Sequence, residues 1–360
     1  MIVLFLLILV TTVFSVQSVL KRYVSNTSVM LNVIVSCWLV IAVYSVIFTT
    51  LVLYQVNFIV FVICIVMASV TMAYFARNEY KTVVQAVRNI KLNDNYIYPI
   101  MLWSGILIFS SIFFQYSERW GWDGSDAWAI WNLHAKFMYS GSDFFNIFAE
   151  PSYTSRDYPL MLPSINAMVW KFTGNMTPMV PIIVSYFITL SVALMLYFSF
   201  RAISYKILGV VSFLIIVSDK WFLKLGAWQY ADVMVSFFLL TSIVLLQQWA
   251  ENGKKIQQAV LLGFFAATCG WVKNEGLLLF LIISLYFALT NIKSVKQILG
   301  YAFGSVIPLT MILVYKFGFT PQNDFLSQLN LQDILTRLMD FSRYIRVAEF
   351  FTMSGVLKYY

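Results

Sequence analysis

Residues 118–141 read ERWGWDGSDAWAIWNLHAKFMYSG and lie between long apolar runs. The stretch contains two acids three residues apart, Asp123 and Asp126, and the only histidine of the chain, His134. It also contains four of the eleven tryptophans, Trp120, Trp122, Trp128 and Trp131. Acidic side chains close to a membrane are costly and usually serve a function. The stretch therefore predicts a functional site at the edge of a membrane.

The composition is that of a membrane protein. The chain is 61% hydrophobic and 11% charged, whereas a soluble domain carries about 25% charged residues. Apolar runs of roughly 20 residues are long enough to span a bilayer. We therefore predict an all-α, polytopic membrane protein with about ten transmembrane helices and with interfacial helices in a large outer loop. The expected spans are Met1–Leu20, Met30–Leu51, Asn57–Phe75, Tyr98–Phe114, Pro178–Phe200, Tyr205–Val217, Ala231–Trp249, Gln258–Trp271, Gly276–Thr290 and Gln297–Phe317.

The expected spans divide the chain into four segments. Residues 1–114 hold the N-terminal transmembrane helices, 115–177 an outer-face loop, 178–317 a transmembrane core and 318–360 an amphipathic segment. In the last segment apolar residues recur at helical spacing, which predicts a helix on the outer surface or a helix of a small, incomplete outer domain. Those residues are Leu331, Ile334, Leu335, Leu338, Phe341, Ile345 and Ala348.

Charge asymmetry predicts the orientation. One set of alternate loops, which begins with Lys21 and Arg22 and includes loop 76–97, holds twelve basic residues and three acids. The opposite loops hold thirteen acids and eleven basic residues. Since basic residues collect in cytoplasmic loops, the first set is predicted to lie inside. Loop 115–177 must then lie outside, with Leu160–Phe172 resting in the interface because about 13 residues are too few to cross. The net charge of +8 needs no nucleic-acid partner.

Several other chemistries are not indicated. The three cysteines, Cys37, Cys64 and Cys269, lie inside apolar runs without metal-ligand spacing, so neither a disulfide framework nor a zinc site is expected. The sequence has no GxxxxGK[ST], HExxH or GxSxG motif, which argues against nucleotide-driven work and zinc hydrolysis.

Five acids fall on the predicted outer side: Asp123, Asp126, Asp157, Asp232 and Glu275. Asp126 could be a general base that deprotonates a hydroxyl, or it could cap a helix N-terminus. Asp123 is the rival base, or part of a turn with the Gly and Ser that follow it. Asp232 could be a second catalytic acid, or it could be a structural residue at the positive end of a helix.

The basic and aromatic neighbours are candidate substrate contacts. Arg156 could bind a phosphate or pair with Asp157. Lys273 could meet a lipid phosphate, or Glu275 could neutralise it. The aromatic candidates could instead be interfacial anchors or core residues without a role in substrate binding. They are Trp128, Trp131, His134 and Tyr230.

Four pieces within residues 115–290 resemble a known group: GWDGSDAWAIWNLHAKF, RDYPLMLP, YADVMVSFFLL and KNEGLLLFL. The chain resembles the membrane glycosyltransferases of the GT-C fold, in the bacterial branch related to protein O-mannosyltransferases and aminoarabinose transferases. The resemblance implies a polyprenyl-phosphate sugar donor, a lipid or glycan acceptor and work at the outer face of the bacterial cytoplasmic membrane. Asp126 or Asp123 matches the first acid of the family pattern, and Asp232 matches the second. The doubled acid leaves the base assignment open.

Other functions stay open at this point. In the same class is a surface-polysaccharide polymerase or ligase. In another class is a transporter or flippase, which predicts polar or broken helices near the membrane midplane. No cofactor follows from the sequence, and the need for a divalent cation stays open. The chain ends soon after its tenth expected span, so we expect it to be shorter than members of the family.

Overall fold

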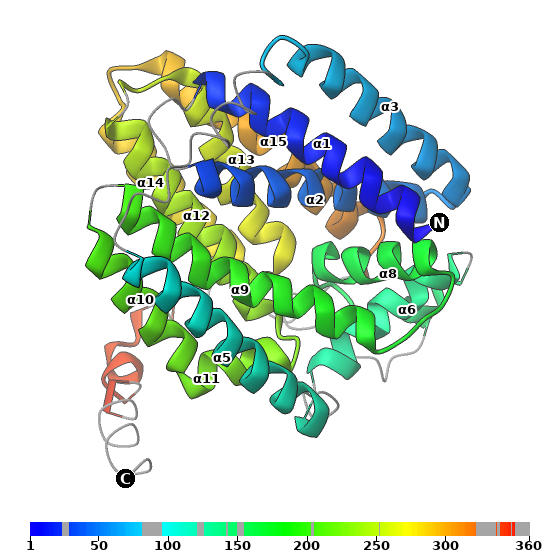
Figure 1. The fold of residues 1–360 in the computed structure, drawn as a ribbon. Helices are drawn as coiled ribbons and strands as arrows, with labels where there is room; N and C mark the ends of the chain where they lie inside the picture. Colours follow the sequence, from blue (N-terminus) through cyan, green and yellow to red (C-terminus); the bar gives the residue numbers. More distant parts are fainter. Residues whose placement is uncertain are drawn as a thin grey trace. The chain divides into compact units, whose positions relative to one another are not determined.

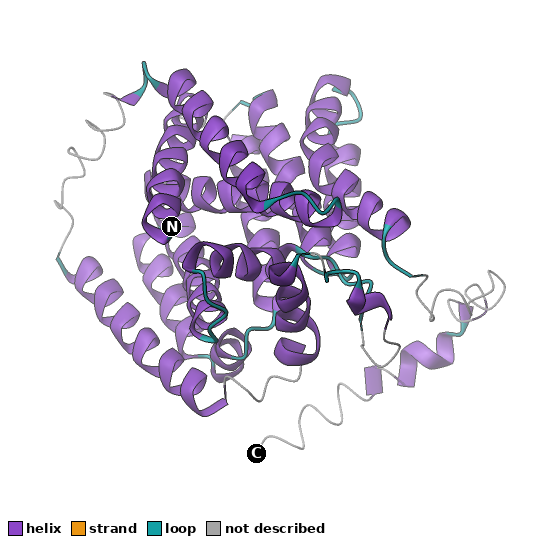
Figure 2. Ribbon diagram, turned by 90° about the vertical axis from the view of Figure 1, so that its right-hand side faces the viewer, coloured by secondary structure: helices purple, strands orange, loops and turns teal. Residues whose placement is uncertain are grey.

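The computed structural model of the chain consists of helices and connecting segments, without a strand among the residues it describes (Figure 2). This confirms the predicted all-α class. The described residues are 1–23, 29–80, 96–120, 126–141, 143–149, 155–202, 205–251, 253–321, 336, 339–346, 348 and 349. They divide into two units, Met1–Phe319 and Thr320–Tyr360.

Seven of the described helices are long and apolar enough to cross a membrane. They are α1 (Ile2–Tyr23), α2 (Val29–Leu53), α3 (Phe58–Ala76), α5 (Ile97–Trp120), α9 (Met179–Ala202), α12 (Ala231–Glu251) and α15 (Val295–Gly318). Three shorter apolar helices are α10 (Lys206–Ser218), α13 (Ile256–Val272) and α14 (Gly276–Thr290). Each of the ten expected spans forms a helix, but only seven have full length. The structure is that of a multi-pass membrane protein, and the expected count of about ten depends on the three shorter helices.

The short helix α10 is continued by α11 (Lys220–Ala227). Asp219 separates the two helices, and its Oδ1 accepts a hydrogen bond from the Phe222 backbone N–H at 2.6 Å, which caps the start of α11. Both helices pack along α5, as Figure 1 shows at the lower left. A second, short helix therefore follows the expected span Tyr205–Val217 directly.

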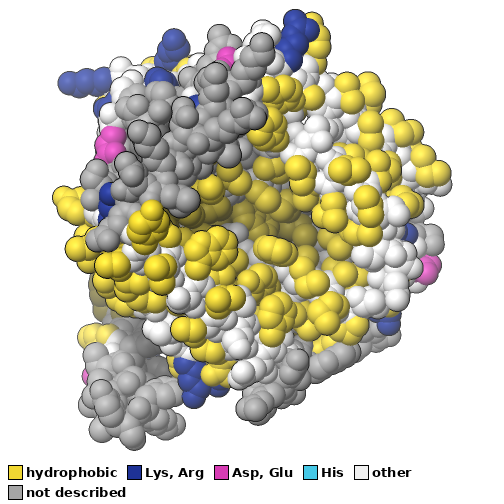
Figure 3. All heavy atoms as spheres, viewed as in Figure 1, with side chains coloured by type: hydrophobic (Ala, Val, Ile, Leu, Met, Phe, Trp, Pro, Cys, Tyr) yellow, Lys and Arg dark blue, Asp and Glu magenta, His cyan; other side chains and the backbone are white. Residues whose placement is uncertain are grey.

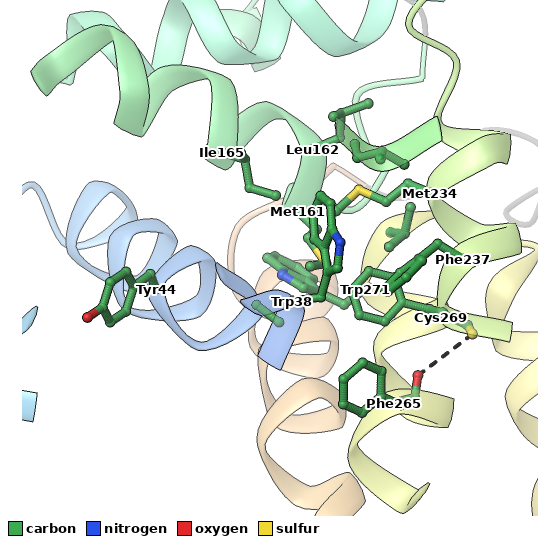
Figure 4. Packing of buried hydrophobic residues seen from close by; sticks show 14 of the residues in the cluster. Trp38, Tyr44, Met161, Leu162, Ile165, Met234, Phe237, Phe265, Cys269 and Trp271 are labelled. Carbon is green, nitrogen blue, oxygen red and sulfur yellow. Dashed lines mark hydrogen bonds between the residues drawn. The ribbon is translucent and has the colours of Figure 1, made fainter. Parts of the chain in front are cut away.

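Helix α13 lies at the centre of the first unit and packs against α12, α14 and α15. Glycines let α13 and α15 approach closely, since a Cβ on Gly263 would meet the Tyr301 carbonyl and one on Gly304 would meet the Val260 carbonyl. At its C-terminal end Trp271 is fully buried, and Figure 4 shows it beside Trp38 of α2 in the same packed cluster. Helix α13 is short, but other helices surround it, and nearly all of its residues are buried.

The outside of the bundle suits a lipid environment. The face in Figure 3 is largely apolar and hollowed at its centre, and charged side chains lie at its margins. On α14, Leu278, Leu281 and Leu285 each expose 60% or more of their surface. Large apolar patches of this kind mark contact with a membrane or a partner.

The loop between α5 and α9 holds a compact helical group. A π-helical turn, η1 (Ala127–Trp131), leads into α6 (Asn132–Ser140), followed by α7 (Asn146–Ala149) and α8 (Met161–Thr173). Helix α8 is the piece expected to rest in the interface. Its residues are nearly all buried, and α8 packs against α2, α6 and α9. Neighbouring helices therefore cover most of α8, including its polar residues Ser164 and Asn166.

The second unit contains part of the expected amphipathic helix. Residues 341–346 are helical, and Phe341 and Ile345 expose their side chains. Leu331, Ile334, Leu335 and Leu338 lie outside the described residues.

The orientation can be tested with two exposed asparagines, Asn78 in the loop predicted to lie inside and Asn175 in the loop predicted to lie outside. Each is replaced by cysteine in a background without the native Cys37, Cys64 and Cys269. A membrane-impermeant maleimide added to intact cells is expected to label N175C and to leave N78C unlabelled. Labelling of N78C alone would reverse the predicted orientation.

Candidate functional site

A lysine and two acids meet where α12, α13 and α14 come together. Lys273 follows α13, and its Nζ lies 3.0 Å from Oδ1 and 3.1 Å from Oδ2 of Asp232, which is in the first turn of α12. Glu275 Oε1 lies 4.0 Å from the same Nζ. Lys273 is mostly buried, but Asp232 keeps 45% of its side chain exposed. The structure thus brings together Asp232 and Lys273, which are 41 residues apart.

The environment keeps Lys273 cationic. Burial lowers the pKa of Lys273, but the hydrogen bonds and charge of Asp232, helped by Glu275 and Tyr158, outweigh burial and raise the pKa overall. The three side chains of Asp232, Lys273 and Glu275 carry one positive charge and two negative charges. Lys273 is therefore a fixed cation inside a site that is acidic overall.

A second ion pair is connected to the first through Asn274. Asp157 Oδ2 accepts hydrogen bonds from Lys316 Nζ at 3.3 Å and from Asn274 Nδ2 at 3.1 Å. The Asp157 carbonyl also accepts one from Lys316 Nζ at 3.1 Å. Lys316 belongs to the last turn of α15. The neighbouring Arg156 instead donates to the Phe148 carbonyl at 2.9 Å. The turn between α13 and α14 therefore joins both ion pairs.

Tyr158 lies among these charged groups. Its ring stacks on Trp131 with 5.5 Å between centroids. Burial raises the pKa of the Tyr158 hydroxyl, and the charges of Glu275, Asp157 and Asp126 raise it further against the opposing charge of Lys273. The charges of Lys273, Glu275, Asp157 and Asp126 thus all influence the Tyr158 hydroxyl.

Asp126 precedes η1 and is half-exposed. Its backbone is helical, with φ −67° and ψ −34°, and its side chain makes no capping hydrogen bond. The N-cap alternative is therefore not what the structure has. Single π-helical turns are frequent at functional sites. Asp123, the rival base, lies outside the described residues.

His134 and the nearby tryptophans occupy different environments. His134 is buried, and its Nδ1 lies 2.7 Å from the Ile130 carbonyl oxygen. Burial lowers the pKa of His134, and the carbonyls of Ile130 and Arg156 and the charge of Asp157 oppose it only in part, so the imidazole is neutral. His134 lies in the core and does not reach a surface. Trp131 is also buried, whereas Trp128 is 39% exposed.

The remaining aromatic candidate, Tyr230, is half-exposed in the turn before α12. Its ring lies 6.2 Å from that of Trp228.

Comparisons of the chain with protein-family models, with curated proteins and with solved structures found no match. What the site can do chemically therefore follows from its own residues.

The site combines a half-exposed carboxylate, two cations held by acids and a phenol, at one end of an apolar bundle. Such a set can accept a proton from a hydroxyl and can stabilise an anion. Among the described residues, no three His, Cys, Asp or Glu side chains are grouped so that they could hold a metal ion. Tyr158, Asn274 and Lys316 were not among the predicted site residues. Tyr158 could have been found, since it follows two candidates in Arg156-Asp157-Tyr158-Pro159.

Proposed function

We propose that the chain is a glycosyltransferase that moves a sugar from a polyprenyl-phosphate donor to an acceptor hydroxyl on a lipid or glycan at the outer membrane face. The contact between Asp232 and Lys273 supports this most directly. It unites an acid at the start of α12 with a cation at the end of α13. A lipid-linked phosphate would present its charge at this level of an apolar bundle.

In the proposed reaction Asp126 accepts the proton of the acceptor hydroxyl as the oxygen attacks the anomeric carbon of the donor sugar. The bond from this carbon to the phosphate oxygen breaks, and the electron pair leaves with the polyprenyl phosphate. Direct displacement inverts the anomeric centre. Lys273 stabilises the charge on the departing phosphate, and Asp232 holds Lys273 in place before the donor binds.

A transporter or flippase is the alternative from another class. It predicts charged groups and broken helices near the midplane. Helices α10 and α11 are interrupted at Asp219, whose side chain caps α11. The two ion pairs instead involve helix ends, since Asp232 begins α12 and Lys316 ends α15. These positions favour chemistry at one face. A polysaccharide polymerase or ligase would use the same site with a growing glycan as acceptor.

The proposal is tested with the purified chain in lipid vesicles that carry a polyprenyl-phosphate hexose labelled in the sugar. The label is expected to move to an added acceptor while free polyprenyl phosphate accumulates in equal amount. Donors with a pentose and acceptors of lipid or glycan type then identify the substrates. Movement of intact labelled donor across the bilayer, without release of polyprenyl phosphate, would contradict the proposal and indicate a flippase.

A further inference from the structure

A pocket of about 270 Å³ lies between α6, α8, the start of α9 and the turn before α12. Its walls include the rings of Trp128, Trp170, Pro178 and Pro181. The Trp170 ring is fixed by a hydrogen bond from its Nε1 to the Thr177 carbonyl at 2.8 Å. Trp128 of the lining lies two residues after Asp126 in the sequence.

Three buried amide side chains lead into this pocket. Asn166 Nδ2 donates to Asn132 Oδ1 at 3.1 Å, and Asn132 Nδ2 donates to Gln229 Oε1 at 2.8 Å. Asn166, Asn132 and Gln229 expose only 1%, 6% and 5% of their surface, and the last two line the pocket. Gln229 Nε2 has no hydrogen-bond partner among the described residues. If all three amide groups were flipped, the Gln229 Nε2 would donate to Asn132 and the Gln229 Oε1 would be the atom without a partner. In either orientation Gln229 can therefore form one hydrogen bond with a ligand in the pocket.

The backbone at Gln229 is unusual. Its φ is +62°, in the left-handed region that a residue with a side chain rarely adopts. Gln229 ends α11, since the Tyr230 N–H donates to the Leu225 carbonyl at 3.0 Å, and helices commonly end with a residue in this conformation, most often glycine. A glycine would take the same φ without strain. Gln229 therefore places an amide group in the pocket, although its backbone conformation is less favourable for glutamine than for glycine.

The lining selects the chemistry of the ligand. None of the pocket residues is acidic, and the one basic residue, Lys136, is exposed. A cation would find no counter-charge there. A neutral polyhydroxylated ring fits better, because its C–H faces pack on the indole rings and its hydroxyls pair with the buried amides.

We infer that this pocket binds a single neutral sugar residue through Trp128, Trp170 and the amide of Gln229. The sugar belongs to the acceptor, since Lys273, which would meet the donor phosphate, is not part of the lining. That assignment as acceptor rests on the proposed glycosyltransferase function, whereas binding of the sugar does not. Asn132 and Asn166 position the Gln229 amide.

Binding is measured with the purified chain in lipid nanodiscs free of glycoside detergents, using methyl hexosides as probes and tryptophan fluorescence as readout. The Gln229→Gly variant removes the amide but suits the positive φ. Relief of the positive φ is offset by the buried Asn132 amide, which loses its acceptor, so thermal unfolding is measured for the variant beside the wild type. The variant is expected to bind the best methyl hexoside at least about tenfold more weakly. The matched control is Gln55→Gly, at an exposed glutamine with φ +54°, which should leave sugar binding unchanged. Trp128→Ala, at a partly exposed position, should also weaken binding.

The outcomes separate the inference from the proposed function. No binding of any methyl hexoside, or equal affinity in wild type and Gln229→Gly, would overturn the sugar pocket. Binding of glycerol phosphate that Lys136→Met abolishes would replace the sugar with an anionic headgroup and overturn it too. Sugar binding lost in Gln229→Gly, in a protein without transfer activity, would support the pocket and reject the enzyme. A short free glycan and its lipid-linked form, compared as competitors, identify the source of the sugar.

Discussion

Replacing Asp126 with asparagine is expected to slow sugar transfer by about 10²–10⁴-fold, which is the usual contribution of a positioned general base. Asparagine keeps the shape of the side chain but cannot take a proton at neutral pH. Asp126 makes no capping hydrogen bond, so the substitution removes no helix cap, and the melting temperature should stay within a few degrees of wild type. The measurement is the rate of label transfer at saturating donor, together with thermal unfolding in the same vesicles.

Two further substitutions control this experiment. Asp143→Asn changes an exposed acid in the same outer segment and should leave the rate unchanged. Asp123→Asn tests the rival base. Full activity of the Asp126 variant with an inactive Asp123 variant would transfer the role to Asp123. A loss of activity that follows loss of the folded state in the Asp126 variant would instead make Asp126 structural.

Local sequence patterns were enough to locate the helices. Each expected span corresponds to a helix, and most of the predicted ends lie within three residues of the helix ends, whereas α5 continues to Trp120 beyond the predicted end at Phe114. Apolar runs locate such helices because a membrane helix must satisfy its backbone internally and cover itself with apolar side chains. Length alone did not reveal which runs are covered by protein. Neighbouring helices bury both α13 and α8, and the interfacial position expected for α8 stays a prediction. Burial of this kind depends on neighbours that come from distant parts of the sequence.

The candidate site was predictable only in part. Charge asymmetry predicts that Asp232 and Lys273 lie on the same side, and both begin or flank helices. The expected acidic partner of Lys273 was Glu275, and the closer contact with Asp232 was not predicted. The partner of Asp157 was not predictable, because Lys316 is 159 residues away and sequence proximity favoured Arg156. The amides of Asn132, Asn166 and Gln229 were missed as well. Each lies singly among apolar residues, and only folding brings the three together.

Replacing Lys316 with methionine is expected to lower the free energy of unfolding by about 3 kcal/mol. Methionine keeps much of the length and apolar packing of lysine, but it leaves the Asp157 carboxylate, 15% exposed, without its cation. Asn274 still donates to that carboxylate, and an amide donor compensates a buried negative charge less well than an ammonium group. The measurement is unfolding by SDS in mixed micelles.

A double variant separates the missing cation from a general loss of packing at the end of α15. Asp157→Asn combined with Lys316→Met removes both charges, and the new amide oxygen can still accept from Asn274. Most of the lost stability should then return, since a buried pair is costly mainly when one partner is left alone. Lys296→Met, at an exposed lysine near the other end of α15, should change stability by no more than about 0.5 kcal/mol. Equal destabilisation in the single and double variants would show that Lys316 acts through its packing and not through the charge of Asp157.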